Sequence, residues 1–227
     1  AKTGGCMIFD LSYIINYDWW DYMKRVSLKP LEVSDAGEVY ELCRGTFREE
    51  YHITEERILE SLFEDPDFSA EESKKIVDEK NGRMIGFIGV KVSHNEQLYP
   101  ASAWISIFAV KKEEQGKGYG TMVLNQVCQS LHKNGINKIY VGQDFNNFFS
   151  GIPDPDEGKE IFFKKNGFTL NRDRHFDLEA DITDNRLIDS FDTSSFDKEF
   201  TVASYKDNKK ELLGFLEREF PGRWVFE

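Results

Sequence analysis

The chain has 227 residues, 40% hydrophobic and 14% aromatic, which is enough to bury a substantial core and argues against wholesale disorder. Its 41 acidic residues outnumber 29 basic ones, and the net charge of −12 disfavours binding to nucleic acid. The charge favours a cationic partner such as an amine, or it serves only to keep the protein soluble.

The sequence offers neither a membrane span nor a metal-binding pattern. No apolar run is long enough to cross a bilayer and the start lacks the features of a signal peptide, so we expect a cytoplasmic protein with no membrane partner. Cys6, Cys43 and Cys128 are far apart and odd in number, and the four histidines show no ligand spacing. We therefore expect no disulfide framework and no metal. A first residue other than Met and an apolar end suggest a fragment.

The first half of the chain predicts two helices and a hairpin after an N-terminal extension, residues 1–25, to which we assign no function. A strand is expected from Val26 to Leu31, followed by a helix that Ser34 and Asp35 can cap. Thr54 can cap a second helix. Asn81-Gly82, between extended runs at 75–80 and 84–92, is a strong hairpin signal.

The second half predicts alternating strands and helices. Residues 103–110 are nearly all apolar or small, typical of a central strand covered on both faces. A glycine-rich stretch at 115–120 leads into a helix that Asn134-Gly135 ends. There follow, in order, a strand over 136–142, a loop over 145–158, a short helix around 161–163 and a last strand over 168–178.

The domain organisation suggested by this pattern is one domain over 26–180, a polar linker over 181–198, and a tail. Residues 199–227 repeat the start of the domain at an offset of 174: Val26, Leu28 and Leu31 match Phe200, Val202 and Tyr205, and Val39 and Leu42 match Leu213 and Leu216. We interpret this tail as the start of a possible second, truncated copy.

The stretch Gln115-Gly116-Lys117-Gly118-Tyr119-Gly120 lies between a strand and a helix. Glycines let main-chain N–H groups approach a ligand, and the N-terminus of a helix favours an anion, so this loop suits a pyrophosphate. The glycine spacing differs from the dinucleotide fingerprint, and no Gly-Lys-Ser/Thr of a P-loop occurs.

The loop resembles the Gln/Arg-x-x-Gly-x-Gly/Ala signature of the GNAT superfamily of N-acetyltransferases, with Gln115, Gly118 and Gly120 at the named positions. About 45 residues later, 161–168 resembles the family's Phe-Tyr-x-Lys-x-Gly-Phe turn. Residues 141–153 and 218–224 further resemble a bacterial subgroup with tandem GNAT domains. The resemblance implies an α/β fold with a mixed, mostly antiparallel sheet, a splayed parallel pair and flanking helices.

The resemblance also implies acetyl-CoA as cosubstrate and an N-acetyltransferase acting by direct attack of a primary amine, on a small molecule or a peptide. The implied cofactor-binding residues are Phe108 and Val110 for the pantetheine arm, the loop residues Gln115, Gly116, Lys117, Gly118, Tyr119 and Gly120 for the pyrophosphate, Asn146 or Asn147, and Phe163. Lys117 either touches a phosphate or is a surface lysine.

Two positions depart from what an active member needs. Phe163 stands where the family often has a tyrosine as general acid, and phenylalanine cannot donate a proton. Asp144 is the best candidate for the general base, or else an ordinary loop residue; Glu113 and Glu114 are expected to be solvated. The aromatic residues Trp19, Trp20, Phe145, Phe148 and Phe149 line a substrate pocket or belong to the core. The loop over 145–158 is our candidate for a specificity element.

Three functional hypotheses remain from the sequence: an active N-acetyltransferase, an acyl-CoA-binding regulatory module with little turnover, and a different nucleotide-binding α/β protein. The alternating glycines and the preceding hairpin disfavour the third. The sequence does not define the acceptor or the oligomeric state.

Overall fold

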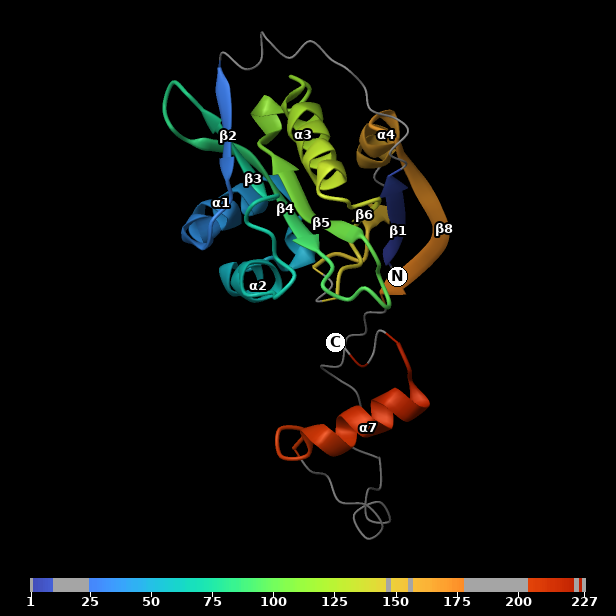
Figure 1. The fold of residues 1–227 in the computed structure, drawn as a ribbon. Helices are drawn as coiled ribbons and strands as arrows, with labels where there is room; N and C mark the ends of the chain where they lie inside the picture. The colour runs from blue at the N-terminus through green and yellow to red at the C-terminus, as the bar shows by residue number, and fades with distance from the viewer. Residues whose placement is uncertain are drawn as a thin grey trace, which may run out of the picture. The chain divides into compact units, whose positions relative to one another are not determined.

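The structure, a computed structural model, describes residues 2–9, 25–145, 148–154, 157–177, 204–222 and 225. They belong to two compact units, Lys2–Phe176 and a smaller one that begins at Asp177. The larger unit is a mixed sheet flanked by helices (Figure 1).

Eight strands form one sheet in the larger unit: β1 (Lys2–Phe9), β2 (Val26–Pro30), β3 (Lys74–Asp78), β4 (Met84–Val92), β5 (Ser102–Val110), β6 (Lys138–Val141), β7 (Ile152–Asp154) and β8 (Phe168–Asp177). Their order is β2-β3-β4-β5-β6-β1-β7, and β8 also pairs with β1. The pairs β2–β3, β3–β4, β4–β5, β1–β6 and β1–β7 are antiparallel, whereas β5 and β6 are parallel. The predicted mixed sheet with one parallel pair is therefore confirmed.

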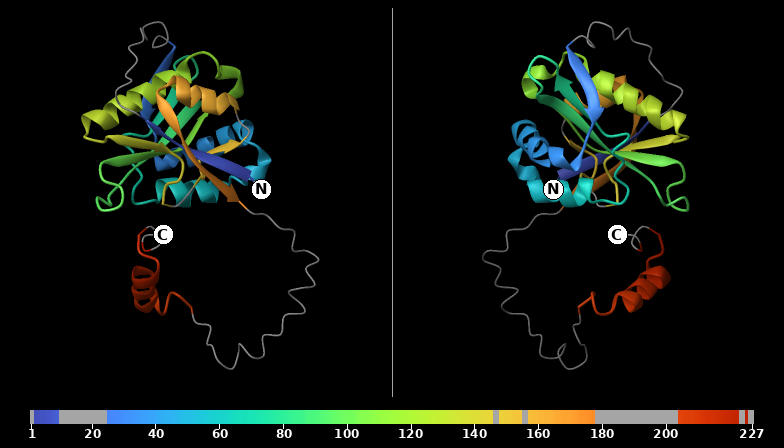
Figure 2. Two further views of the ribbon diagram at one scale, coloured as in Figure 1. Left: turned by 90° about the vertical axis from the view of Figure 1, so that its right-hand side faces the viewer. Right: turned by 60° about the vertical axis from the view of Figure 1, so that its left-hand side comes forward.

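Helices cover both faces of the sheet (Figure 2). The apolar side of α3 (Tyr119–Lys133) packs with α4 (Glu157–Lys165) over one face, in a cluster that includes Val123, Val127 and Phe163. On the other face, α1 (Ala36–Thr46) and α2 (Glu55–Ile58), which continues into the π-helical turn η3 (Leu59–Phe63), form a second cluster. The central strand β5 contributes to both clusters, as expected for a strand buried on two faces.

Local signals in the sequence place several element ends correctly. The Thr54 side chain accepts a hydrogen bond from the Arg57 N–H at 3.1 Å and caps α2. Gly82, with φ of 70°, lies in the turn that joins β3 to β4. The helix predicted to follow the glycine-rich stretch is present as α3, and the predicted last strand is present as β8.

The N-terminal extension contains an element that we did not predict. Residues 2–9 form β1, which pairs with β6 at Met7↔Val141 and with β7 at Gly5↔Ile152. A second unpredicted strand, β7, lies inside the expected loop over 145–158. Residues 10–24, with Trp19 and Trp20, lie outside the described residues.

The smaller unit contains α7 (Lys209–Glu219), none of whose residues is buried. This helix lies where the offset of 174 residues places a counterpart of α1. The expected linker over 181–198 lies outside the described residues, and so do residues 199–203, where the strand of the possible second copy is expected to begin. The repeat therefore stays a prediction.

Candidate active site

The two parallel strands at the centre of the sheet diverge. Their ladder runs from Ser102↔Lys138 to Ile105↔Val141, and the Gly142 N–H closes it with a 2.9 Å hydrogen bond to the Ile105 carbonyl oxygen. Beyond this point β5 continues through residues 106–110 with no partner strand on that side among the described residues. The sheet therefore opens at the C-terminal half of β5.

A β-bulge lies at the point of divergence. On β4, Val90 pairs with Ile105 and Gly89 with Ile107, so Ser106 is an extra residue with no opposite partner. A bulge of this kind changes the face to which the following side chains point. Accordingly, Ile105 packs in the α3 cluster and Ile107 in the α1 cluster, although two positions apart.

Main-chain groups of the unpaired edge point into the opening. The Lys111 N–H donates to the Ile85 carbonyl oxygen at 2.9 Å, which fixes the hydrogen-bonded positions of the β4–β5 ladder. Because these positions alternate along an antiparallel strand, Phe108 and Val110 direct their N–H and C=O groups away from β4. The two residues expected to bind the pantetheine arm thus present main-chain donors and acceptors at the open edge.

The glycine-rich loop lies at the end of this edge. The Gln115 side chain donates from Nε2 to the Val110 carbonyl oxygen at 2.8 Å and holds the loop against β5. Gly116 and Gly118 have φ of 75° and 85°, a conformation that favours glycine, and Gly118 is the N-cap of α3. The N–H groups of Gly116, Lys117 and Gly118 donate to no other main-chain group of the described residues.

These loop amides lie at the N-terminus of a helix of 15 residues, where the helix dipole favours an anion. The first intrahelical bond runs from the Met122 N–H to the Gly118 carbonyl oxygen at 3.0 Å. The Lys117 ammonium pairs with Glu114 at 3.0 Å, so it remains beside the loop. Gln115, Gly116 and Lys117 are exposed, whereas Tyr119 is buried in the α3 cluster.

A cleft passes through the opening between the strands and encloses about 470 Å³ of empty space, including the part open to solvent. Residues from both faces of the sheet line it: Phe47, Tyr51, Ile105, Ser106, Ile107, Phe108, Val141, Gly142, Phe149, Gly151, Ile152, Lys159 and Phe163. A molecule bound in the cleft would therefore contact residues from the α3–α4 side of the sheet and from the α1–α2 side.

The wall on the α1–α2 side is aromatic. The Phe149 ring lies 5.3 Å from that of Phe47 and 5.7 Å from that of Tyr51, and the Lys159 ammonium lies 5.5 Å from the Phe47 ring centroid. Aromatic groups with such spacing attract one another through their edges and faces, and they attract cations. Phe149, for which the sequence left pocket and core open, lines the cleft, while Phe148 is fully buried.

The turn that carries this wall requires glycine at one position. Gly142 has φ of 70°, and a Cβ atom added there would lie 2.6 Å from the Phe149 carbonyl oxygen and 2.7 Å from the Gly151 nitrogen. The Gln143 N–H donates to the same Phe149 oxygen at 2.7 Å. Gly142 and Gln143 consequently lie directly against Phe149 and Gly151 beside the end of β6.

Asp144, our candidate for the general base, is fully buried and does not line the cleft. Its Oδ1 lies 2.7 Å from the Lys91 ammonium, which also contacts Asp65 Oδ2 at 2.9 Å. Lys91 itself is only 1% exposed. This placement favours a structural role for Asp144, and its role as a base stays a prediction.

Among the other candidates, Phe163 lies in the lining, with its ring 6.3 Å from that of Phe108. Asn146 and Asn147 lie outside the described residues.

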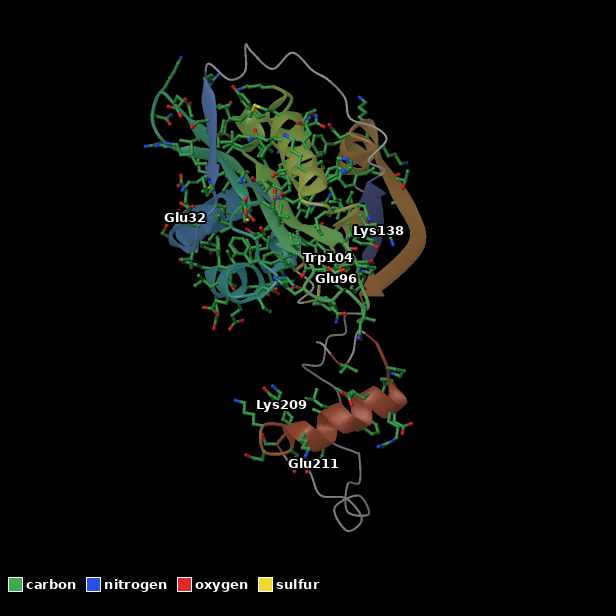
Figure 3. The ribbon with its side chains drawn as sticks, in the orientation of Figure 1. Glu32, Glu96, Trp104, Lys138, Lys209 and Glu211 are labelled. Carbon is green, nitrogen blue, oxygen red and sulfur yellow. The ribbon has the colours of Figure 1, made fainter. Side chains whose placement is uncertain are left out.

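Trp104 lies on β5, with Glu96 and Lys138 at the same end of the sheet (Figure 3). Its ring stacks with that of Tyr140 at a centroid distance of 6.0 Å.

The described residues contain no group of three or more His, Cys, Asp or Glu side chains that could hold a metal ion. Burial raises the pKa of the Cys43 and Cys128 thiols to about 12, so neither supplies a thiolate near neutral pH. Of the helices in the described parts of the chain, none is both long and apolar enough to span a membrane.

The sequence model of the Acetyltransferase (GNAT) family matches residues 36–150, which include the divergent strands and the glycine-rich loop. The chain belongs to the GNAT acetyltransferase family. A sequence comparison with curated proteins gave no significant match.

Solved acetyltransferases share this fold at low sequence identity. A GCN5-related N-acetyltransferase from Sphaerobacter thermophilus is 15% identical, with a TM-score of 0.55 over 75% of this chain and 49% of that one. A GCN5-related glucosamine N-acetyltransferase region of a fungal multi-domain GH3 beta-N-acetylglucosaminidase is 17% identical, with a TM-score of 0.52 over 74% of this chain and 20% of that one. The chain thus spans about half the length of the first protein.

A third similar structure is nearly the same length as the matched region. It is an aminoglycoside acetyltransferase from an uncultured soil metagenomic sample, in complex with trehalose. It is 16% identical, with a TM-score of 0.51 over 70% of this chain and 98% of that one. At such identities the likeness concerns the GNAT fold alone.

Among the aromatic, polar and charged residues that line the cleft of this GNAT domain, sequence reasoning missed four. Phe47 and Tyr51 come from the end of α1 and the turn after it, and Lys159 from α4. Ser106 is the one polar residue in the otherwise apolar run 103–110, which was a signal that could have been followed. The other three are far from the glycine-rich loop in the sequence, and only the fold brings them together.

Proposed function

We propose that this GNAT protein transfers the acetyl group of acetyl-CoA to a primary amine by direct attack. The proposal rests mainly on one observation: the unpaired edge of β5 leads straight to the exposed loop amides at the N-terminus of α3. An extended arm with amide groups can pair with that edge as an added strand would, and a pyrophosphate suits the loop.

In this proposal the pyrophosphate of acetyl-CoA binds to the amides from Gln115 to Gly120, with Lys117 beside them. The pantetheine arm lies along Phe108 and Val110 and carries the thioester into the cleft. The Phe108 N–H, which is directed into the opening where Phe108 lines the cleft, polarises the thioester carbonyl oxygen as negative charge develops on it. Asn146 or Asn147 is retained as a proposed contact to the arm.

The acceptor enters from the α1–α2 side, between Phe47, Tyr51 and Phe149. The neutral amine nitrogen attacks the carbonyl carbon and loses a proton to solvent. The C–S bond breaks, and the thiolate leaves with its electron pair. Because Phe163 cannot donate a proton, the thiolate is protonated from solvent. The high pKa of the two buried thiols supports direct attack over transfer through either of them. A cytoplasmic location remains a sequence-based prediction.

Calorimetric titration of the intact protein with acetyl-CoA tests the first half of the proposal. We expect saturable binding with one site, weakened at least tenfold when Gly118→Val places a branched side chain where φ is 85°. No measurable binding by the intact protein would refute the proposed function.

Release of free CoA in the presence of amines tests the second half. Glucosamine, spermidine, 2-phenylethylamine and a short peptide with a free N-terminus represent four acceptor chemistries. Tight binding of acetyl-CoA without acetylation of any amine would instead favour the alternative, an acyl-CoA-binding regulatory or degenerate module. Phe163 in the lining is the observation that keeps this alternative open.

A further inference from the structure

One polar side chain in the cleft has no partner. Ser106 is 2% exposed, and its Oγ makes no hydrogen bond within the described residues. A buried hydroxyl without a partner is unfavourable, because it has lost its hydrogen bonds to water and gained none in return. Native proteins rarely retain such a group without a use for it.

Two other buried serines at the sheet behave differently. Ser73 Oγ accepts a hydrogen bond from the Val90 N–H at 2.9 Å and donates to the Val90 carbonyl oxygen at 3.3 Å. Ser102, on the same strand as Ser106, donates to the Pro100 carbonyl oxygen at 3.0 Å. Ser27 Oγ on β2 also has no hydrogen-bond partner within the described residues, but Ser27 does not line the cleft, whereas Ser106 does.

The position of Ser106 explains why the hydroxyl is left without a partner. It is the extra residue of the bulge and the first residue beyond the β5–β6 ladder, and it lines the cleft. The surrounding lining is mostly apolar. Among its described side chains only Ser106 and Tyr51 carry a hydroxyl oxygen that can accept a hydrogen bond, because an ammonium such as that of Lys159 only donates.

We propose that Ser106 Oγ accepts a hydrogen bond from the N–H of the attacking amine and so directs the nitrogen lone pair toward the thioester carbon. This role rests on the proposed acetyl transfer. As the N–C bond forms, positive charge develops on the nitrogen, and a hydrogen bond from a charged donor is stronger than a neutral one.

The hydroxyl stays un-ionised throughout the step. The C–S bond breaks as the tetrahedral centre collapses, the thiolate keeps the electron pair, and the proton lost by nitrogen reaches the thiolate through solvent. The products are the amide and free CoA thiol. Ser106 acts as a catalytic residue through its contact with the nitrogen, and it does not act as a base.

The test compares Ser106→Ala with Ser73→Ala in the full chain, using acetyl-CoA and two nucleophile probes, 2-phenylethylamine and hydroxylamine. The phenyl group of 2-phenylethylamine can pack against the aromatic wall of the cleft. Hydroxylamine is small enough to reach Ser106 whatever the shape of the acceptor site. For Ser106→Ala we expect kcat to fall about 10–100-fold. Its affinity for acetyl-CoA should equal that of the wild type, and its urea midpoint of unfolding should be equal or higher, because an unfavourable buried hydroxyl is removed and no hydrogen bond is lost in the free protein.

Ser73→Ala should show the reverse: a lower unfolding midpoint with kcat per folded molecule unchanged. The proposal is overturned if Ser106→Ala retains kcat or lowers the midpoint as much as Ser73→Ala does. It is also overturned if the wild type binds acetyl-CoA yet acetylates neither probe. Failure of the wild type to bind acetyl-CoA would refute the proposed function itself, which calorimetry detects separately.

Discussion

At the scale of single residues, a buried charge determines what Asp144 can do. Lys91, Asp65 and Asp144 are all buried, and the two carboxylates share one ammonium. Charges removed from water persist only when they are paired, so these residues depend on one another. Because Asp144 is fully buried and does not line the cleft, its carboxylate is out of contact with an acceptor bound there.

Replacing Asp144 with asparagine distinguishes a structural residue from a base. In Asp144→Asn the Lys91 ammonium keeps its ion pair with Asp65, so we expect the free energy of unfolding to fall by only about 1–3 kcal/mol. The kcat per folded molecule should stay within a few-fold of the wild type. A general base would instead lose about 10²–10⁴-fold in kcat. Urea unfolding and steady-state kinetics measure the two quantities.

Lys91→Met is the matched comparison for this site. It leaves two carboxylates buried without a cation, and a loss of about 3–5 kcal/mol is expected. If Asp144→Asn proved fully stable but inactive, the structural assignment would be wrong and the base assignment would be favoured.

At the scale of elements, one arginine joins a helix to the wall of the cleft. Arg57 on α2 donates from Nη2 to the Phe148 carbonyl oxygen at 2.7 Å and from Nη1 to the Tyr51 carbonyl oxygen at 3.1 Å. Its guanidinium also lies 5.1 Å from the Phe148 ring centroid. The helix thereby fixes the two segments that carry Tyr51 and Phe149.

Loss of this link should loosen the acceptor side without affecting the cofactor side. For Arg57→Ala we expect the KM for the amine to rise about 5–50-fold, since charge-assisted hydrogen bonds contribute about 1.5–3 kcal/mol. The affinity for acetyl-CoA should stay unchanged. Arg44→Ala, which removes an exposed ion pair with Glu41, is the control and should behave as wild type. Equal weakening of both substrates in Arg57→Ala would contradict this assignment.

The elements predictable from sequence are those determined by neighbours along the chain. Thr54 caps its own helix, Asn81-Gly82 turns its own hairpin, and Gly116 and Gly118 begin α3. The location of the loop follows from such signals, and the family and the fold were predicted from the resemblance of the loop and of residues 161–168 to the GNAT motifs.

Features that depend on distant partners could not be predicted in this way. Ser106 becomes a bulge residue only because Gly89 and Val90 set the register of the neighbouring strand. Lys91 is within a strand whose apolar run gives no hint of Asp65 and Asp144. The strand β1 contains Gly4 and Gly5, which disfavour strands, and its partners lie more than 130 residues away.

At the scale of the whole molecule, the larger unit contains a strand from each end of its sequence. β1 pairs with β6, β7 and β8, and these three come from the last part of the unit. The divergent strand β6 therefore has β5 on one side and β1 on the other. The support of the cleft thus includes a segment outside the region that the family model matches.

Deleting residues 2–9 should destabilise the larger unit, because the main-chain groups of β6 and β7 that pair with β1 lose their hydrogen bonds. We expect a loss of about 3–5 kcal/mol, or roughly 10 °C in Tm, together with association through the exposed strand edges. Thermal unfolding and size-exclusion chromatography measure both effects. Deletion of residues 204–227, which include α7, serves as the control and should leave the Tm of the larger unit unchanged. An unchanged Tm after removal of residues 2–9 would show that β1 is dispensable.

The pairing of β1 also restricts when the domain can fold during synthesis. Met7 leaves the ribosome more than 130 residues before Val141, its partner in the sheet. At about 5–20 residues per second, β1 waits several seconds or longer with its hydrogen-bonding edges unpaired. The β2–β5 meander can form meanwhile from neighbouring segments, but the cleft is completed only when the last strands emerge. A nascent chain stalled before β6 would therefore expose β1 as an unpaired strand that is prone to aggregate, and we expect chaperones to bind there first.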